Sequence, residues 1–164
     1  MRLFLLAAAF AGLLSAGGLQ LSTPVDAVSA YYRAMNSADL TALKHVMEEA
    51  SYDTEMQIYA LSIAFKDPDL RQHLNGYAEH EADKLAVERA VADKLRQRPK
   101  RSVSGFTVQK LGKERCSVKY RENGKKRTLY VRKIGEIWKI DYMAGRPTEN
   151  TVTTEQKSVA SIKD

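Results

Sequence analysis

The sequence has little cysteine and little histidine. Cys116 is the only cysteine among 164 residues, so no disulfide can close within the chain. It lies in a segment of alternating residues, where we expect a small buried apolar side chain. The histidines, His45, His73 and His80, are scattered, whereas metal-binding histidines on one helix usually stand at i and i+4. We therefore predict no disulfide framework, no metal site and no cofactor.

Long hydrophobic runs are also missing, except at the N-terminus. Arg2 precedes an uncharged apolar run from Leu3 to Leu14, and small residues follow at positions 15–18. The run is shorter than the ~20 residues that span a bilayer, and its flanks are typical of a secretory signal peptide. We predict a signal peptide over residues 1–18 and an exported, periplasmic or secreted protein. The alternative is an uncleaved segment that anchors the protein to the inner membrane.

Charge is present in ordinary amount but is distributed unevenly. Charged residues make up 28% of the chain and hydrophobic residues 44%, which is typical of a globular protein. From Thr23 to Arg98, nine Lys or Arg stand against thirteen Asp or Glu, a balance of −4. From Pro99 to Arg146, fourteen stand against four, a balance of +10. The sequence thus has an acidic first half and a strongly basic second half.

The acidic half carries helical signals. Thr23-Pro24-Val25-Asp26 offers an N-cap, a proline at the first helical position and an acid in the first turn. Apolar residues then recur at helical spacing as far as Met35, and again over Leu40–Met47 and Tyr52–Phe65. These periods predict three consecutive helices.

A further helical stretch begins at Asp67-Pro68-Asp69 and continues to Arg98. Gly76 lies inside this stretch, and glycine in a helix interior costs about 1 kcal/mol relative to alanine. We therefore expect a kink or a break at Gly76. Pro99 ends the helical half.

The basic half alternates between apolar and polar residues, which is the period of a strand. Strands are expected over Val103–Leu111, Cys116–Arg121, Arg127–Ile134 and Glu136–Met143. Asn123-Gly124, between the second and third of these, is the strongest two-residue hairpin signal. Turns this short predict an antiparallel meander.

Helices first and strands second predict an α+β fold. At this length the chain has room for one domain, which we place over residues 23–146. In it, N-terminal helices pack on a curved antiparallel sheet of three to four strands. Residues 147–164 are rich in Thr, Ser, Glu and Lys without periodicity, and we predict a flexible tail there.

Two sequence signatures bracket the predicted domain. The first is Pro24-x-x-Ala27-Val28-x-x-Tyr31-Tyr32-x-Ala34-x-Asn36-x-x-Asp39-Leu40. The second is Gly135-Glu136-Ile137-Trp138-Lys139-Ile140-Asp141, on a last strand that follows a hairpin. In this order they resemble the nuclear-transport-factor-2-like superfamily, in particular its exported bacterial members of undefined function. The resemblance implies a cystatin-like cone, with helices packed into the concave side of a strongly bent sheet.

The resemblance also implies a pocket between the helices and the sheet. The candidate lining residues are Tyr31, Tyr32, Met35, Trp138 and Tyr142. Many members of the superfamily place a strand soon after the second helix, whereas Tyr52–Arg98 is helical throughout. Such a helical insert would fill or cap the pocket.

An enzymatic role is the alternative that the resemblance raises. Family enzymes that resemble ketosteroid isomerase use a tyrosine of the first helix as an oxyanion donor and a strand aspartate as the base. Tyr31 and Asp141 match these places in the sequence. However, Asp141 alternates with Trp138 and Ile140, so we expect it to face away from a pocket on their side.

Cations cluster around the predicted hairpin. They are Lys119, Arg121, Lys125, Lys126, Arg127, Arg132 and Lys133. Several alternate with the apolar residues, so we expect them to project from an outer face of the sheet. Such a face would dock an acidic protein, lipid head groups or a surface polyanion, and the alternative is a solvated face without a partner. Nucleic acid would fit basic hairpins with Tyr120 and Tyr130, but the predicted export argues against it.

No motif in the sequence identifies a reaction. We therefore predict an exported, non-enzymatic binding or interaction module with a basic sheet face for an anionic or protein partner. Curved sheets of the superfamily commonly pair face to face, so the resemblance also implies a homodimer through the sheet. The alternative is a small-molecule pocket protein, with or without isomerase- or hydratase-like activity.

Overall fold

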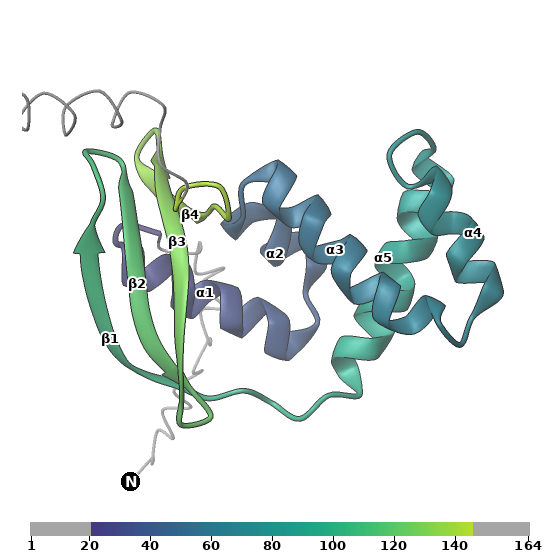
Figure 1. The fold of residues 1–164 in the computed structure, drawn as a ribbon, viewed down its shortest axis with the longest axis horizontal. Helices are drawn as coiled ribbons and strands as arrows, with labels where there is room; N and C mark the ends of the chain where they lie inside the picture. The colour runs from purple at the N-terminus through teal and green to yellow at the C-terminus, as the bar shows by residue number, and fades with distance from the viewer. Residues whose placement is uncertain (1–20, 146–164) are drawn as a thin grey trace, which may run out of the picture.

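The computed structural model describes residues 21–145, so the predicted signal peptide over 1–18 and the predicted tail over 147–164 lie outside the described residues. Within them, five helices precede four strands (Figure 1). The elements are α1 Pro24–Ser37, α2 Leu40–Val46, α3 Glu49–Ala64, α4 Pro68–Gly76, α5 Glu81–Arg96, β1 Val103–Lys110, β2 Arg115–Glu122, β3 Lys125–Ile134 and β4 Ile137–Ile140. The predicted α+β fold is confirmed. None of the described helices is long and apolar enough to cross a membrane.

Side-chain caps mark where α1, α2 and α4 begin. Thr23 and Asp26 form a capping box at α1: the Thr23 hydroxyl accepts from the Asp26 N–H, and the Asp26 carboxylate accepts from the Thr23 N–H. Asp39 and Asp67 cap α2 and α4 by accepting from the backbone N–H three residues later. The helix starts predicted at Thr23 and Asp67 are therefore confirmed.

The predicted break at Gly76 separates α4 from α5. α4 ends at Gly76, and α5 begins at Glu81. A Cβ atom on Gly76 would lie 1.8 Å from Oδ2 of Asp83, so a larger residue there would displace this carboxylate. Nδ1 of His73 lies 2.7 Å from Oδ1 of the same aspartate. Asp83 thus connects the two helices across their turn.

The strands form a meander in the order β1-β2-β3-β4, with every neighbouring pair antiparallel. β2 and β3 meet at Asn123-Gly124, whose φ values of 47° and 81° match a type I′ turn, so the predicted hairpin is confirmed. The chain between α2 and α3 extends the sheet at the β4 edge. There Met47 forms a parallel bridge with Ile140, an arrangement that the sequence pattern did not predict.

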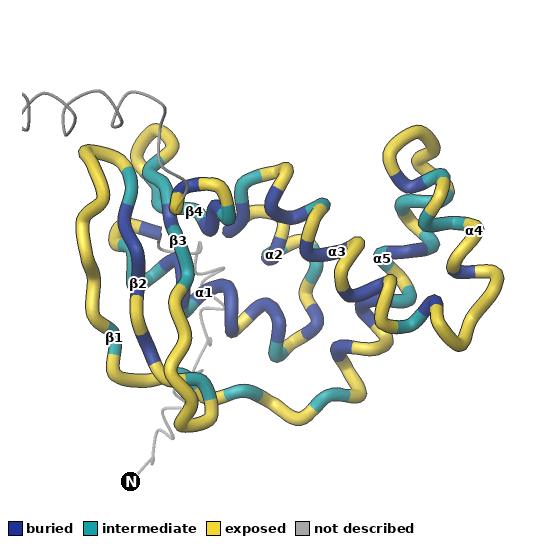
Figure 2. Tube along the Cα trace, viewed as in Figure 1, coloured by how far each residue is buried: buried dark blue, intermediate teal, exposed yellow. Residues whose placement is uncertain are grey.

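Alternation along β2 separates two faces of the sheet. Cys116, Val118 and Tyr120 are buried on the face that the helices cover, which we call the inner face. Directly opposed residues of neighbouring strands share a face, so the register places Leu129 and Val131 of β3 there too. α1 contacts all four strands. The opposite side, which we call the outer face, includes the exposed residues Lys119, Arg121, Lys126 and Thr128. Figure 2 shows buried and exposed positions following one another along β2.

The buried hydrophobic residues form one contiguous cluster that links the helices to the sheet. Members with 0% exposure are Ala27, Val28, Leu43, Val46, Met56, Ala60, Val87, Val91, Val118, Val131 and Ile140. They come from α1, α2, α3 and α5 and from three of the strands. Full burial of one such Val, Leu or Ile side chain contributes about 1.5–3 kcal/mol.

We expect Leu43→Ala to lower the free energy of unfolding by about 2–5 kcal/mol. Leu43 is 0% exposed, so its truncation leaves a cavity in the core. Leu61→Ala is the matched control, because Leu61 on α3 is 55% exposed and its loss should change the stability by less than about 0.5 kcal/mol. Urea denaturation measures both variants. Equal losses at the two positions would contradict this packing.

Candidate functional site

The residues predicted to line a pocket have different environments. Tyr31, Tyr32 and Met35 are buried on α1, whereas Trp138 and Tyr142 are half-buried. The Tyr31 ring packs edge-on against Tyr32, with ring centroids 5.1 Å apart. Tyr31 and Tyr142 meet through a shared hydrogen-bond partner on α3.

That partner is Glu55, a buried carboxylate. The Tyr31 hydroxyl donates to its Oε1 at 2.8 Å, and the Tyr142 hydroxyl donates to its Oε2 at 2.5 Å. One turn earlier on α3, Oγ of Ser51 accepts from the Tyr142 backbone N–H at 3.0 Å. These three bonds connect α1, α3 and the chain that follows β4.

Glu55 was not among the residues predicted from the sequence, although its position carries a signal. The residue stands three positions after Tyr52 and four before Tyr59, and both tyrosines are buried. Residues at these spacings share one side of a helix, so Glu55 lies on the buried side of α3. A carboxylate there requires hydrogen-bond donors, which points to a polar interior.

The tyrosine hydroxyls around Glu55 stay protonated. Burial raises the pKa of Tyr31 well above its ordinary value, and the negative charge of Glu55 raises it further. The same two causes raise the pKa of Tyr142. Both hydroxyls are therefore neutral donors at physiological pH, and both are already bonded to Glu55. The arrangement holds three segments of the chain together.

The last strand is shorter than the predicted Glu136–Met143: β4 ends at Ile140 and a turn follows, so Asp141 comes after the strand. Its side chain lies on the other side of the sheet. The Asp141 side chain is 2% exposed, and its Oδ2 lies 2.7 Å from Nε of Arg132. Arg132 follows the inner-face residue Val131 in β3, so its side chain belongs to the outer face. Asp141 thus faces away from the helices, as the alternation predicts, while Tyr31 is on the helical side.

The seven predicted patch cations divide between the two faces. On the outer face are Lys119, Arg121, Lys126 and Arg132. On the inner face are Lys125, Arg127 and Lys133. The register decides this division: Arg127 is opposite the buried Tyr120, and Arg121 is opposite Lys126.

The register adds two more cations to the outer face. Arg132 is directly opposite Arg115 on one side and Lys139 on the other. We call the resulting set the outer basic face: Arg115, Lys119, Arg121, Lys126, Arg132 and Lys139. The one carboxylate that the described chain places on this face is Asp141, which is buried and paired with Arg132. A hollow of about 540 Å³ at one end of the face is lined by Arg115 and Arg132 and by the turn residues Gly112, Lys113 and Glu114, so a second carboxylate lies at this end.

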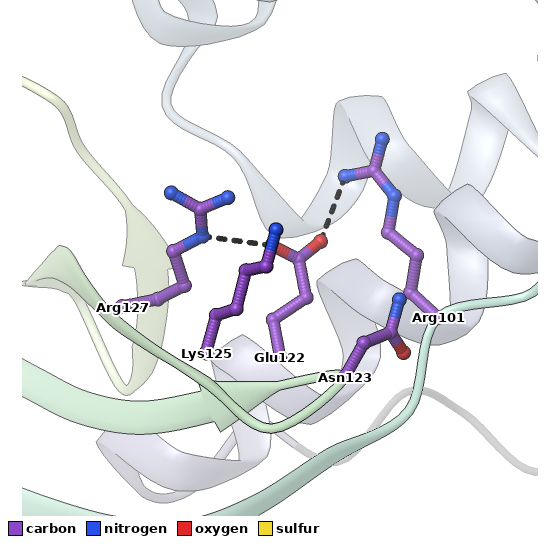
Figure 3. A pocket seen from close by; sticks show the side chains of 5 residues that line it. All are labelled: Arg101, Glu122, Asn123, Lys125 and Arg127. Carbon is purple, nitrogen blue, oxygen red and sulfur yellow. Dashed lines mark hydrogen bonds and ion pairs between the residues drawn. The ribbon is translucent and has the colours of Figure 1, made fainter.

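A second basic site lies at the hairpin end of the inner face. Its lining residues are Arg101, Glu122, Asn123, Lys125 and Arg127, around an open space of about 300 Å³ that we call the hairpin pocket. Figure 3 shows Arg101 and Arg127 reaching Glu122 from opposite sides. None of the five residues predicted to line a pocket lines this one or the hollow beside the outer basic face.

The helical half carries a more acidic pocket of about 360 Å³ between α3 and the turn before α5. Its lining includes Asp53, Tyr77, His80 and Lys84. Nζ of Lys84 lies 3.1 Å from Oδ1 of Asp53, so this charge is paired. Across residues 21–145, no three His, Cys, Asp or Glu side chains gather in a way that would hold a metal ion.

We expect Glu55→Gln to destabilise the protein by about 1–3 kcal/mol. Glutamine offers one acceptor oxygen, and its NH₂ group can only donate, so the hydroxyl proton of Tyr31 or Tyr142 loses its acceptor. The control is Glu114→Gln in the exposed turn before β2, with an effect below about 0.5 kcal/mol. Urea denaturation measures both changes, and a negligible effect at Glu55 would mean that the network does not support the fold.

Tyrosine titration gives a second test of the interior. Burial is the leading cause of a raised pKa at Tyr31, Tyr32, Tyr52, Tyr59, Tyr77, Tyr120 and Tyr142. A raised pKa means that the native state binds these protons more tightly than the unfolded state does. The stability they contribute is therefore complete below about pH 10 and is lost as the pH rises beyond it.

In the absorbance of tyrosinate, we expect these seven to titrate only when the native protein unfolds at alkaline pH. In urea, all eight tyrosines of the chain should titrate near their ordinary pKa of about 10. Reversible titration of all eight near that pH, with the circular dichroism of the fold intact, would contradict the burial described here.

Comparison with known proteins gives no relative for this chain. No family model, no curated protein and no solved structure matches it. The resemblance to the nuclear-transport-factor-2-like superfamily therefore stays a prediction based on the two signatures.

Proposed function

We propose that this protein is an exported binding module that docks an anionic partner on its outer basic face. The observation that carries the proposal is the register of β2, β3 and β4, which gathers six cations on one face with one buried carboxylate. Within residues 21–145, Asp141 offsets Arg132, and Lys119 and Lys126 keep their charge unpaired, so the face has a net positive field. An acidic protein, lipid head groups or a surface polyanion would supply the missing charge.

The arrangement of the cations supports a partner over a merely solvated face. Arg121 is directly opposite Lys126, and Arg132 is directly opposite Arg115 and Lys139. Like charges in such positions destabilise a sheet. Departures of this kind from the most stable choice are expected at functional sites. An anionic partner bound over these cations would offset the repulsion between them.

The accessible part of the outer basic face is its lysines. The residues between the cations are less accessible, because Ser117 is 4% exposed and the backbone at Gly145 packs against the Tyr130 ring. Within residues 21–145, Lys119 and Lys126 have no ion-pair partner. Their ammonium groups are therefore available to an incoming anion.

The same charges argue against a second copy on this face. A homodimer through the sheet would bring two sets of cations together without a counter-charge, which is costly in an interface. We therefore place an anionic partner there. The proposed export favours a partner outside the cytoplasm over nucleic acid.

A small-molecule pocket protein is the second candidate, with isomerase- or hydratase-like chemistry as its enzymatic form. Glu55 favours it, because a buried carboxylate lies beside two of the predicted pocket residues, Tyr31 and Tyr142. It ranks second because these three groups satisfy one another. Nothing in their geometry leaves a hydroxyl for a substrate.

Charge reversal tests the proposal. The variant Lys119→Glu, Arg121→Glu, Lys126→Glu changes three exposed residues of the outer basic face. We expect it to lose retention on heparin and on anionic vesicles, by at least about tenfold in Kd at low salt, because the steering field changes sign. Binding of the unchanged protein should weaken as salt is added.

The matched control moves the same charge change to the helical half. Lys66→Glu, Arg89→Glu, Lys94→Glu alters three exposed cations outside the sheet and should retain most of the binding. If both triple variants bind alike, net charge alone governs binding and the outer basic face is not the docking surface. A circular dichroism melt of each variant confirms that it is folded.

A further inference from the structure

The hairpin pocket lies on the opposite side of the sheet from the outer basic face. Its three cations are Arg101, from the linker after α5, and Lys125 and Arg127, from β3. Glu122 is the one carboxylate of its lining, so the fixed charges of the pocket sum to +2. We infer that the hairpin pocket is a binding site for a phosphate group, whose charge of about −1.5 to −2 at neutral pH matches this excess.

Glu122 orients the two arginines of the pocket. Nη1 of Arg101 lies 3.1 Å from its Oε1, and Nε of Arg127 lies 2.9 Å from its Oε2. Both carboxylate oxygens are thereby engaged by cations, so the charge of Glu122 is offset before an anion arrives. The guanidinium groups are held on either side of it (Figure 3).

The linker that carries Arg101 is fixed to the helices. Nη2 of Arg101 donates to the Tyr59 hydroxyl at 2.9 Å. The backbone N–H and C=O of Arg101 each bond to the side-chain amide of Asn36 at 2.8 Å. A site that is ordered before binding loses less conformational entropy when the ligand arrives.

Donors remain for the ligand. Among the described residues, the terminal Nη atoms of Arg127, Nζ of Lys125 and Nδ2 of Asn123 have no hydrogen-bond partner. Oδ1 of Asn123 accepts from the N–H and hydroxyl of Ser102, which leaves its NH₂ group as a donor. An arginine fork matches two phosphate oxygens, and a lysine ammonium adds a point charge.

The size of the pocket fits this class of ligand. Its volume of about 300 Å³ equals about ten water molecules at ~30 Å³ each. That space holds a phosphate group and leaves room for an ester substituent toward solvent. Inorganic phosphate, a soluble phosphate monoester and a phospholipid head group all supply this chemistry.

Calorimetric titration of the purified protein at constant ionic strength tests the inference. The probes are inorganic phosphate, glycerol phosphate and vesicles that contain phosphatidic acid. We expect phosphate to saturate one site, and Lys125→Gln with Arg127→Gln to raise its Kd by about tenfold or more. Arg127→Lys keeps the charge but removes the fork, and should raise the Kd by about threefold.

Lys119→Gln with Lys139→Gln is the matched control, because it removes the same charge from the outer basic face. Its Kd for phosphate should stay within about twofold of the unchanged protein. If the pocket pair weakens glycerol phosphate but not the vesicles, the ligand is a soluble phosphate compound. If it also weakens the vesicles, a lipid head group reaches the pocket.

Two results would overturn the site. One is the absence of saturable phosphate binding by a protein whose circular dichroism shows that it is folded. The other is equal weakening by the pocket pair and by the control pair, which would reduce the effect to net charge. Neither result depends on whether a macromolecule docks on the outer basic face.

Discussion

Packing of α1 against the inner face of the sheet is the interaction on which the other features depend. Val28 of α1 and Val118, Val131 and Ile140 of the sheet are all 0% exposed within one cluster. Because strand side chains alternate, burying Val118 also turns Lys119 outward. A slip of one residue would exchange the two faces and bury the cations. The register that the core selects therefore also creates the outer basic face.

Hydrogen bonds and ion pairs hold together segments that are also packed through the apolar core. Glu55 connects α1, α3 and the chain after β4, and Arg101 connects the linker to Tyr59 and Glu122. The tyrosine bonds to Glu55 and the Arg101 bond to Tyr59 each have a charged partner, and a bond of this kind contributes about 1.5–3 kcal/mol. Their larger effect is to exclude alternative packings of these segments, because a buried carboxylate left without its donors is strongly unfavourable. The interior thus accepts few alternative arrangements of these segments.

The two basic sites use the same residue types in different ways. On the outer basic face, cations stand opposite cations, so their field extends into solvent and is screened by salt. In the hairpin pocket, Arg101 and Arg127 are fixed by Glu122 at 3.1 and 2.9 Å. Fixed guanidinium groups favour recognition of a single anionic group. The electrostatic field of the outer basic face instead favours a partner whose negative charge is spread over a large surface. The strand alternation of β3 divides its cations between these two roles.

Much of the local structure follows from the sequence alone. The capping residues Thr23 and Asp67, the break at Gly76 and the turn at Asn123-Gly124 all act within a few residues, so local patterns are sufficient to predict them. The α+β order and the uneven charge of the two halves can be read in the same way. The predicted pocket residues could be placed on their elements, but their partners could not.

Only the tertiary structure decided which distant residues meet. Glu55 lies 24 residues from Tyr31 and 87 from Tyr142, and no periodic pattern extends over such separations. Arg101 reaches Glu122 only because the linker folds back along the hairpin. Strand pairing likewise decided that Lys125 and Arg127 lie on the inner face and Lys126 on the outer. Sequence periodicity fixes which residues share a face of their own element, whereas packing decides what that face contacts.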